Sequence, residues 1–351
     1  MVLKKTPKTF YIGDSEGKGV RDEKAVLSPD GRISLLADNE THSKLGLWDL
    51  KTGKEIKNFD IESPTDEFAS IAKVHALAIS PDNCYALYNP RPEEEMKQIV
   101  MLDLQTGQEI TRLHGHTSVV NCVAFSPDGR RALSGSLDKT IKLWDLSAGR
   151  TIQTLTGHTE MIVSVAFSPD GRYALSSSFD NTAKIWNLDT GQEVRTLQGH
   201  GRFQPGDIAY LTSAVFSPNG RQVLTTGADQ TMRLWDKATG REVRRYESKD
   251  NYLNSASFSP DGRYAYLISV HGMIIVDLAS GAELARRIDY SDGEYVVKTP
   301  EGYFDASADG AKHVQIIVDG KEQPLGSLYA RYYRPDLVIL ALAGKKPPWV
   351  K

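Results

Sequence analysis

The sequence predicts an all-β fold, a seven-bladed β-propeller, on three observations. A Ser-Pro-Asp-Gly turn recurs at intervals of about 42 to 52 residues, which is the period of propeller blades. Each turn lies between alternating apolar and polar segments, as β-strands require. A third apolar segment of each unit ends in an acidic or amide residue. The intact turns are Ser28–Gly31, Ser126–Gly129, Ser168–Gly171 and Ser259–Gly262, and the altered turns are Ser80–Asn83 and Ser217–Gly220.

One repeat contains four strands. The first, Val119–Phe125, leads into a turn whose proline and glycine suit the second and last positions of type I geometry. The second strand is Arg131–Ser136, and the third ends at Leu143–Asp145. A glycine turn then leads to an outer strand, Thr151–Leu155. Four short strands with turns at even spacing make one blade.

Two dipeptides recur in register with these strands. They are Gly-His at Gly115-His116, Gly157-His158 and Gly199-His200, and Trp-Asp at Trp48-Asp49, Trp144-Asp145 and Trp235-Asp236, with Trp186-Asn187 a near match. On these residues the chain resembles the WD-repeat propeller family over roughly residues 5 to 320. The resemblance implies a scaffold that binds partners and is not an enzyme.

Matching the family position by position gives blades three to five one polar network each. The predicted sets are His116, Ser134, Asp138 and Trp144; His158, Ser176, Asp180 and Trp186; and His200, Thr225, Asp229 and Trp235. We expect the aspartate to accept from the histidine, and the hydroxyl to bridge the histidine and the indole. Although Ser, His and Asp also form hydrolase triads, three equivalent copies indicate a structural role, because a catalytic set is normally built once.

Blades two and six depart from this pattern. Leu102-Asp103 and Val276-Asp277 replace the Trp-Asp pair, and Val270 takes the place of the network aspartate in blade six. We expect these blades to depend on apolar packing and to be less rigid. Blade two also carries an acidic insertion, Pro90–Lys97, interpreted as a solvated loop or a docking element.

A seventh blade is expected after the sixth. Thr299–Gly302 has the form of a degenerate turn, and Val314–Val318 would be the third strand of this blade. Its outer strand would come from Thr9–Ile12, so that pairing of the two ends of the chain closes the ring without an open edge. The propeller domain is therefore predicted to span residues 1–322.

Residues 323–351 are predicted to form a short tail of helical and extended structure. Leu325, Leu328, Tyr329, Tyr332 and Tyr333 have helical spacing, and a second helix is expected at Leu337–Ala343. The block from Thr299 to Leu337 resembles a linker in some bacterial WD-repeat proteins that carry caspase-like peptidase domains. This resemblance implies a bacterial source. It leaves open that the chain is a sensor or regulatory module of such an effector, or that the tail packs on the propeller.

The family binds partners on the face that carries the connections between blades. Matched positions on this top face are Val119, Asn121, Leu137, Met161, Val163, Phe179, Tyr210 and Tyr252, with Phe203 in an insertion above them. Further matched positions are Thr212, Ala228, Asn254, Arg21, Glu23, Lys73 and His75. One side of the face is apolar and the other charged, which predicts a protein or peptide partner. The alternative is that these side chains fill the central channel.

Composition argues against several other functions. The net charge of −3 and pI near 6.3 disfavour nucleic acid. No metal, phosphate or cofactor motif is present, and the two cysteines make no disulfide framework. No apolar run is long enough to span a membrane and no signal peptide is apparent. We therefore expect a cytoplasmic protein that acts without a cofactor, nucleic acid or a membrane.

Overall fold

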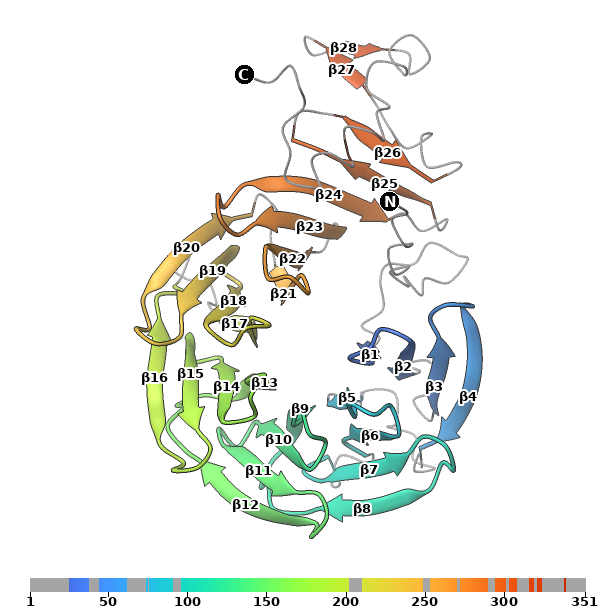
Figure 1. Ribbon diagram of the computed structural model, residues 1–351, viewed down its shortest axis with the longest axis vertical. Helices are drawn as coiled ribbons and strands as arrows, with labels where there is room; N and C mark the ends of the chain where they lie inside the picture. Colours follow the sequence, from blue (N-terminus) through green and yellow to red (C-terminus); the bar gives the residue numbers. More distant parts are fainter. Residues whose placement is uncertain are drawn as a thin grey trace.

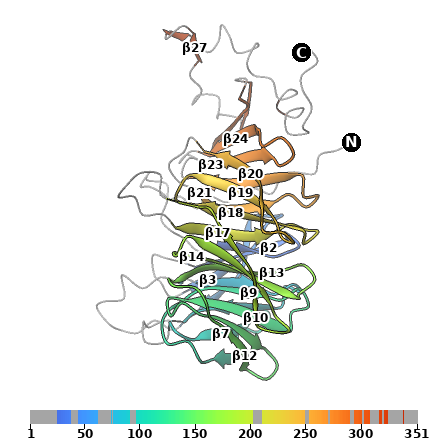
Figure 2. The ribbon, with the colours of Figure 1, turned by 90° about the vertical axis from the view of Figure 1, so that its left-hand side faces the viewer.

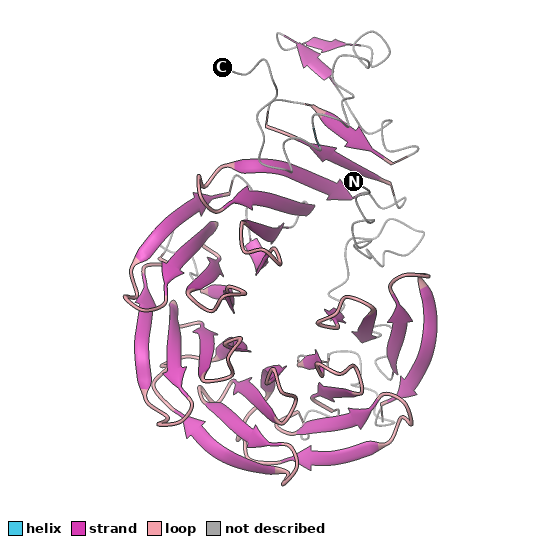
Figure 3. Cartoon of the chain, viewed as in Figure 1, coloured by secondary structure: helices cyan, strands magenta, loops and turns pink. Residues whose placement is uncertain are grey.

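The computed structural model describes residues 25–37, 44–61, 74, 76–90, 96–201, 210–248, 253–269, 272–289, 294–300, 303–307, 316–318, 321–323 and 338. Its elements are strands throughout (Figure 3). Six sheets of four or more strands follow one another around a central axis as the blades of a propeller (Figure 1). The side view in Figure 2 shows the strands running across the thickness of this disc.

Each blade is an antiparallel sheet whose strands lie in chain order from the axis outward. The strands of blades one to three are β1 (Ala25–Leu27), β2 (Ile33–Ala37), β3 (Lys44–Asp49), β4 (Lys54–Asp60); β5 (Leu77–Ile79), β6 (Tyr85–Tyr88), β7 (Ile99–Asp103), β8 (Glu109–Leu113); and β9 (Val120–Phe125), β10 (Arg131–Ser136), β11 (Ile141–Asp145), β12 (Arg150–Leu155). Those of blades four to six are β13 (Ile162–Phe167), β14 (Tyr173–Ser178), β15 (Thr182–Asn187), β16 (Glu193–Gln198); β17 (Leu211–Phe216), β18 (Gln222–Gly227), β19 (Thr231–Asp236), β20 (Glu242–Glu247); and β21 (Leu253–Phe258), β22 (Tyr264–Ser269), β23 (Gly272–Asp277), β24 (Glu283–Asp289). The predicted blade-three strands are confirmed within two residues at each end.

The repeated turn is held by its own serine. In blade three the Ser126 hydroxyl donates to Asp128 Oδ1 at 2.5 Å and accepts the backbone N–H of Arg131 at 2.9 Å. The N–H of Gly129 donates to the Ser126 carbonyl, with φ at +70°, a conformation that glycine adopts without steric cost. The other five turns have the equivalent serine-to-Asp or serine-to-Asn bond. The turn therefore fixes the register of the first two strands locally.

The cores lie between blades. Phe167 of β13 packs on a cluster that contains Leu133 and Leu143 of the preceding blade. Trp144 of β11 shares a cluster with Leu87 and Ile99 of blade two. Because each cluster joins two successive blades, a blade is stabilised mainly by its neighbours.

The outer strands carry a β-bulge in all six blades. The register shifts beside the Trp-Asp position or its replacement, as between Leu143 and Trp144 opposite β12. This leaves one apolar residue of each outer strand in the bulge. In five blades it is exposed: Ile56, Ile110, Ile152, Val194 and Val243. Bulges twist an edge strand and disfavour pairing with another chain.

The prediction of seven blades is wrong, because the described residues form six blades. Residues expected in the seventh form β25 (Tyr295–Lys298) and β26 (Phe304–Ala306), which pair with each other. These strands extend the sheet of blade six: Arg286 of β24 pairs with Lys298 of β25. The outer edge of β24 has backbone N–H and C=O groups that need partners. The hairpin of β25 and β26 therefore pairs with this edge and does not form a separate sheet.

Other parts of the predicted seventh blade are not brought together. Ile316–Val318 (β27) pairs with Lys321–Gln323 (β28) in a separate hairpin, and the expected closing strand Thr9–Ile12 lies outside the described residues. The predicted tail helices also lie outside them, apart from Val338, whose side chain is buried. The described elements give no support to a helical tail.

Candidate functional site

The top face is the end of the propeller that carries the turns between second and third strands and the connections from one blade to the next. Backbone bonds pair its predicted positions within each blade. The N–H of Leu137 donates to Val119 O at 2.9 Å, and the N–H of Phe179 donates to Met161 O at 3.1 Å. In blade five the N–H of Ala228 donates to Tyr210 O at 2.9 Å. The sequence positions thus lie together at one end of each blade.

An aromatic pair joins two blades on this face. The rings of Phe179 and Tyr210 are stacked, with centroids 4.3 Å apart and planes inclined by 5°. Phe179 comes from blade four and Tyr210 from the start of blade five, and both side chains are half-buried. Offset aromatic pairs add stabilisation beyond the area they bury, so this pair also fastens the two blades together.

Further apolar side chains belong to the same face. Leu137 is 37% exposed, while Val119, Met161 and Val163 are half-buried. We call Val119, Leu137, Met161, Phe179 and Tyr210 the apolar top-face set. Its members come from blades three to five. Asn254 of blade six is exposed and Ala228 is half-buried.

Two predicted contact residues also bond the next blade. Asn121 Nδ2 donates to the carbonyl of Ile162 in the next blade at 3.0 Å. Thr212 Oγ1, at the matching position of blade five, donates to the carbonyl of Leu253 in the blade after it at 2.7 Å. The residue type gave no signal of this role, because an amide or hydroxyl serves equally well as a partner contact.

Six predicted top-face residues lie outside the described part of the chain: Phe203, Tyr252, Arg21, Glu23, Lys73 and His75. Their placement on the face therefore stays a prediction.

The structure brings the four residues of each predicted network together. In blade three, His116 Nε2 lies 2.7 Å from Ser134 Oγ, and the Trp144 indole N–H donates to that oxygen at 2.8 Å. His116 Nδ1 lies 2.7 Å from Asp138 Oδ2. Because Asp138 is an acceptor when ionised, we assign the ring proton to Nδ1, which leaves Nε2 to accept from the serine hydroxyl.

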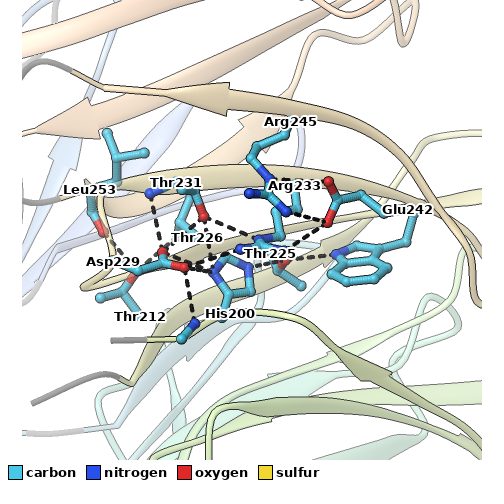
Figure 4. Close-up of polar contacts among 12 residues, drawn as sticks. His200, Thr212, Thr225, Thr226, Asp229, Thr231, Arg233, Glu242, Arg245 and Leu253 are labelled. Atoms are coloured by element: carbon cyan, nitrogen blue, oxygen red, sulfur yellow. Dashed lines mark hydrogen bonds and ion pairs between the residues drawn. The ribbon is translucent and has the colours of Figure 1, made fainter. Parts of the chain in front are cut away.

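Blades four and five repeat this arrangement. Ser176 bridges His158 at 2.8 Å and Trp186 at 2.9 Å. In blade five the bridging hydroxyl is that of Thr225, 2.7 Å from His200 Nε2 and 2.8 Å from Trp235 Nε1 (Figure 4). All three bridging residues are fully buried. A substrate therefore has no access to these hydroxyls, each of which is already held by an indole, and the sets are not hydrolase triads.

The network aspartates are held ionised. Burial raises the pKa of Asp229, but hydrogen bonds from His200 and Thr231 outweigh it and lower the pKa to about 2. In blades three and four, hydrogen bonds from histidine and threonine likewise outweigh burial, and they lower the pKa values of Asp138 and Asp180 well below their usual range. Thr140 and Thr182 take the part of Thr231 in those blades.

These shifts predict acid sensitivity. A carboxyl whose folded pKa is lowered stabilises the fold above its unfolded pKa of 3.8, and this stabilisation is lost between about pH 4 and pH 2. The urea midpoint should therefore fall over this range. Replacing Asp229 by asparagine should make that fall shallower, because one proton fewer is taken up on unfolding. Equal acid slopes for the two proteins would contradict the assignment.

Blade five also holds an ion network that the sequence reading missed. The guanidinium of Arg233, buried on β19, lies 3.4 Å from Asp229 and 2.7 Å from Glu242, and Arg245 pairs with Glu242 at 3.1 Å (Figure 4). In blade four, Lys184 and Glu193 pair at 2.8 Å. The sequence contains a signal for these ion pairs. In both blades a lysine or arginine lies two residues before the tryptophan, and a glutamate lies seven residues after it.

Metal binding and membrane insertion were the remaining possibilities for the described residues. Among them no three His, Cys, Asp or Glu side chains are grouped to hold a metal ion. No helix in the described part of the chain has the length and apolar character needed to cross a membrane.

Comparison with known proteins identifies part of the repeat. Residues 107–145, 149–187 and 191–236 match the family model described as WD domain, G-beta repeat. These three stretches contain the three complete His, Ser or Thr, Asp and Trp networks. The two altered blades, two and six, lie largely outside the match.

Similar proteins cover about a third of the chain. The serine-threonine kinase receptor-associated protein of Gallus gallus is 28% identical over an alignment of 148 residues, which covers 34% of this chain and 41% of that protein. Protein groucho of Drosophila melanogaster is 34% identical over 123 residues, 33% of this chain and 14% of that protein. The chain thus spans less than half the length of these relatives. Both come from animals and give no support to a bacterial source.

Proposed function

We propose that this chain, with three WD repeats within residues 107–236, is a non-catalytic scaffold that binds a partner protein or peptide on its top face. The observation that carries the proposal is the half-buried Phe179–Tyr210 stack, on the face where Met161 and Leu137 also lie. Aromatic side chains dominate binding hot spots. Exposed apolar groups that gather on one face are typical of interaction sites.

The relatives support a protein partner. The name of one relative describes a protein associated with a serine-threonine kinase receptor. Among the described residues, Asn121 and Thr212 already use their amide and hydroxyl groups to bond the next blade. The apolar top-face set is therefore the surface that we assign to a partner. The proposal involves a cytoplasmic protein and no cofactor, nucleic acid or membrane.

The test is affinity capture from native lysate, read by mass spectrometry. The variant Phe179→Asp with Met161→Asp should lose at least about 100-fold in affinity for the captured partner, because it charges two central contact positions. Its melting temperature should fall by only a few degrees, since both side chains are half-buried.

The matched control is Ile152→Asp, which charges an apolar residue that is 51% exposed on the outer strand β12. This variant should capture the partner as the wild type does. Equal capture by the control and by the top-face double variant would contradict the proposal.

A second candidate function rests on the resemblance of the block from Thr299 to Leu337 to the bacterial linker. In this interpretation the propeller is a sensor or regulatory module of a larger or separate effector, such as a caspase-like peptidase. Sequencing the gene through and beyond codon 351 tests it. A reading frame that continues into a peptidase-like domain, or an adjacent gene for one, would favour this candidate over a free-standing scaffold.

A further inference from the structure

The facing sides of blades one and six form a surface apart from the top face, which we call the seam. Among the described residues, five hydrophobic clusters join blade one to blade two and so on, in order, to blade six. None of these five clusters joins blade six to blade one. The two blades are the ends of the arc of six (Figure 1).

The seam side of blade six keeps apolar side chains partly exposed. Tyr266 of β22 and Met273 of β23 are both half-buried. In blade three the residues at these positions are Leu133 and Ile141, which are fully buried in the cluster shared with blade four. The residues that match Tyr266 in the remaining blades are fully buried as well: Leu35, Leu87, Leu175 and Leu224. Blade six therefore exposes part of the face that in the other blades lies beneath the following blade.

The seam side of blade one is exposed in the complementary way. Leu27 of β1 is 61% exposed, whereas Phe167, at the matching position of blade four, packs on the preceding blade. Trp48 is half-buried, whereas Trp144 at the same position of blade three is fully buried. Blade one therefore exposes part of the face that elsewhere meets the preceding blade. Together the two faces form one apolar surface that requires cover.

The outer strands indicate that this cover is not another four-stranded blade. Lys57 of β4 and Arg195 of β16 donate to backbone carbonyls of the next blade, at 2.8 and 2.9 Å. Ala285 holds the matching position of β24, opposite Ile275, and its methyl group cannot donate. Because blade six lacks this bond to a following blade, the seam suits a narrower occupant such as a single extended segment.

A buried hydroxyl on blade one also lacks a partner. Ser34 pairs with Trp48 across β2 and β3, and its Oγ is buried without a hydrogen-bond partner among the described residues. Blades three and four have Ala132 and Ala174 at this position. A buried polar group without a partner is costly. An extended segment lying on this face would offer Ser34 the backbone N–H and C=O groups that an apolar side chain cannot.

The segment best placed to cover the seam is the one that leads into β1. It contains a run of residues with high β-propensity, Thr9-Phe10-Tyr11-Ile12. The 13 peptide steps from Ile12 to Ala25 can span up to about 45 Å, which is more than the length of any strand of blade one. A tethered segment also competes at an effective concentration of about 1 mM, which favours it over a free partner. The C-terminal part of the chain instead leaves blade six through β25 and β26, outside the ring (Figure 1).

We propose that residues 9–12 lie as an extended segment on the seam. Their apolar side chains would cover Leu27 and Trp48 on blade one, and Tyr266 and Met273 on blade six. The seam is then an intramolecular docking site that takes one strand-like segment of this chain and no further blade.

The experiment measures the rate at which a maleimide labels a thiol introduced on the seam. In the full chain, Cys84→Ser removes the exposed native thiol, and Ala25→Cys introduces the reporter on β1. Ala25 is exposed, whereas Val165 at the matching position of blade four is buried. Cys122 is buried, so labelling of this second thiol would report unfolding.

In this background, Phe10→Asp with Ile12→Asp should raise the labelling rate about tenfold, the ratio of an effective concentration near 1 mM to a dissociation constant near 0.1 mM. Leu27→Asp, which charges the other side of the contact, should raise the rate to the same extent. Tyr11→Asp is the alternative if the double variant labels Cys122 and so fails to fold.

The matched control is Thr6→Asp with Ser15→Asp, which adds the same charge to the same segment outside the apolar run. It should change the labelling rate by less than about twofold, as is usual for substitutions away from a contact. A second control, Tyr329→Asp with Tyr332→Asp, charges the C-terminal tail and should also leave the rate unchanged.

Three results would overturn the inference. Equal rates for the Phe10, Ile12 variant and its matched control would show that residues 9–12 do not cover the seam. A rate that rises only with the tail variant would assign the seam to the tail. A rate that falls only when cell lysate is added would assign it to a separate partner. Each result leaves the proposed top-face site intact, because Phe179→Asp with Met161→Asp tests that site separately.

Discussion

Replacing Trp144 by alanine is expected to lower the free energy of unfolding by about 4 kcal/mol, the cost of removing a large aromatic side chain from a core. Trp144 is fully buried between blades two and three. Its indole N–H donates to Ser134, and its ring meets His116 edge-on at 6.1 Å. The substitution therefore creates a cavity and also removes a donor from a buried network. Urea unfolding at pH 7 measures the change.

Trp48 provides the matched control. It occupies the same position in blade one but is only half-buried, and Leu36 replaces the bridging serine there, since it pairs with Gly46 as Ser134 pairs with Lys142. Trp48→Ala should cost clearly less than Trp144→Ala. Similar costs for the two would show that the network and the deep burial contribute little to stability.

The second large effect is expected for Asp229→Asn, which should destabilise the fold by about 3 kcal/mol, because it leaves a buried cation with only one of its two charge partners. Asp229 accepts from His200 and Thr231 and faces the guanidinium of Arg233 at 3.4 Å. Arg233 is 5% exposed, so water compensates poorly for the lost charge. Glu242 remains as its other partner and limits the effect.

Asp138→Asn in blade three is the matched control for this prediction. The cation at the position of Arg233 is Lys142, whose ammonium donates to Thr154. Asp138→Asn should therefore only weaken hydrogen bonds, and it should lower the free energy of unfolding by about 1.5 kcal/mol. Equal losses for the two aspartates would mean that Arg233 and Asp229 are not coupled. A less than additive loss in the Asp229→Asn, Arg233→Met double variant would confirm the coupling.

Much of one blade could be predicted because its information is local. The turn from Ser126 to Gly129 specifies its own hydrogen bonds, and the strand register follows from it. The network of His116, Ser134, Asp138 and Trp144 spans fewer than thirty residues of sequence, so its recurrence in register was readable. The ion pair of a cation with a glutamate in blades four and five recurs at the same spacing. It could have been predicted in the same way, but it was not.

The top face was less predictable. Position in the repeat identified which residues lie at that end of each blade, as for Leu137 and Phe179. It did not separate side chains available to a partner from those that bond the next blade, as Asn121 does. That distinction depends on the distance between two blades, which a pattern within one blade does not contain.

By itself the sequence determined the all-β repeat, the turn of each blade and the three buried networks. Their contacts lie within one repeat, where spacing along the chain dictates which groups meet. Only the tertiary structure decided the number of blades and the partners across them. Tyr295–Lys298 joined the open edge of β24 rather than a new sheet, and Phe179 met Tyr210 across a blade boundary. Edge pairing and stacking between blades depend on which surfaces the assembled ring brings together, and spacing along the chain does not encode this.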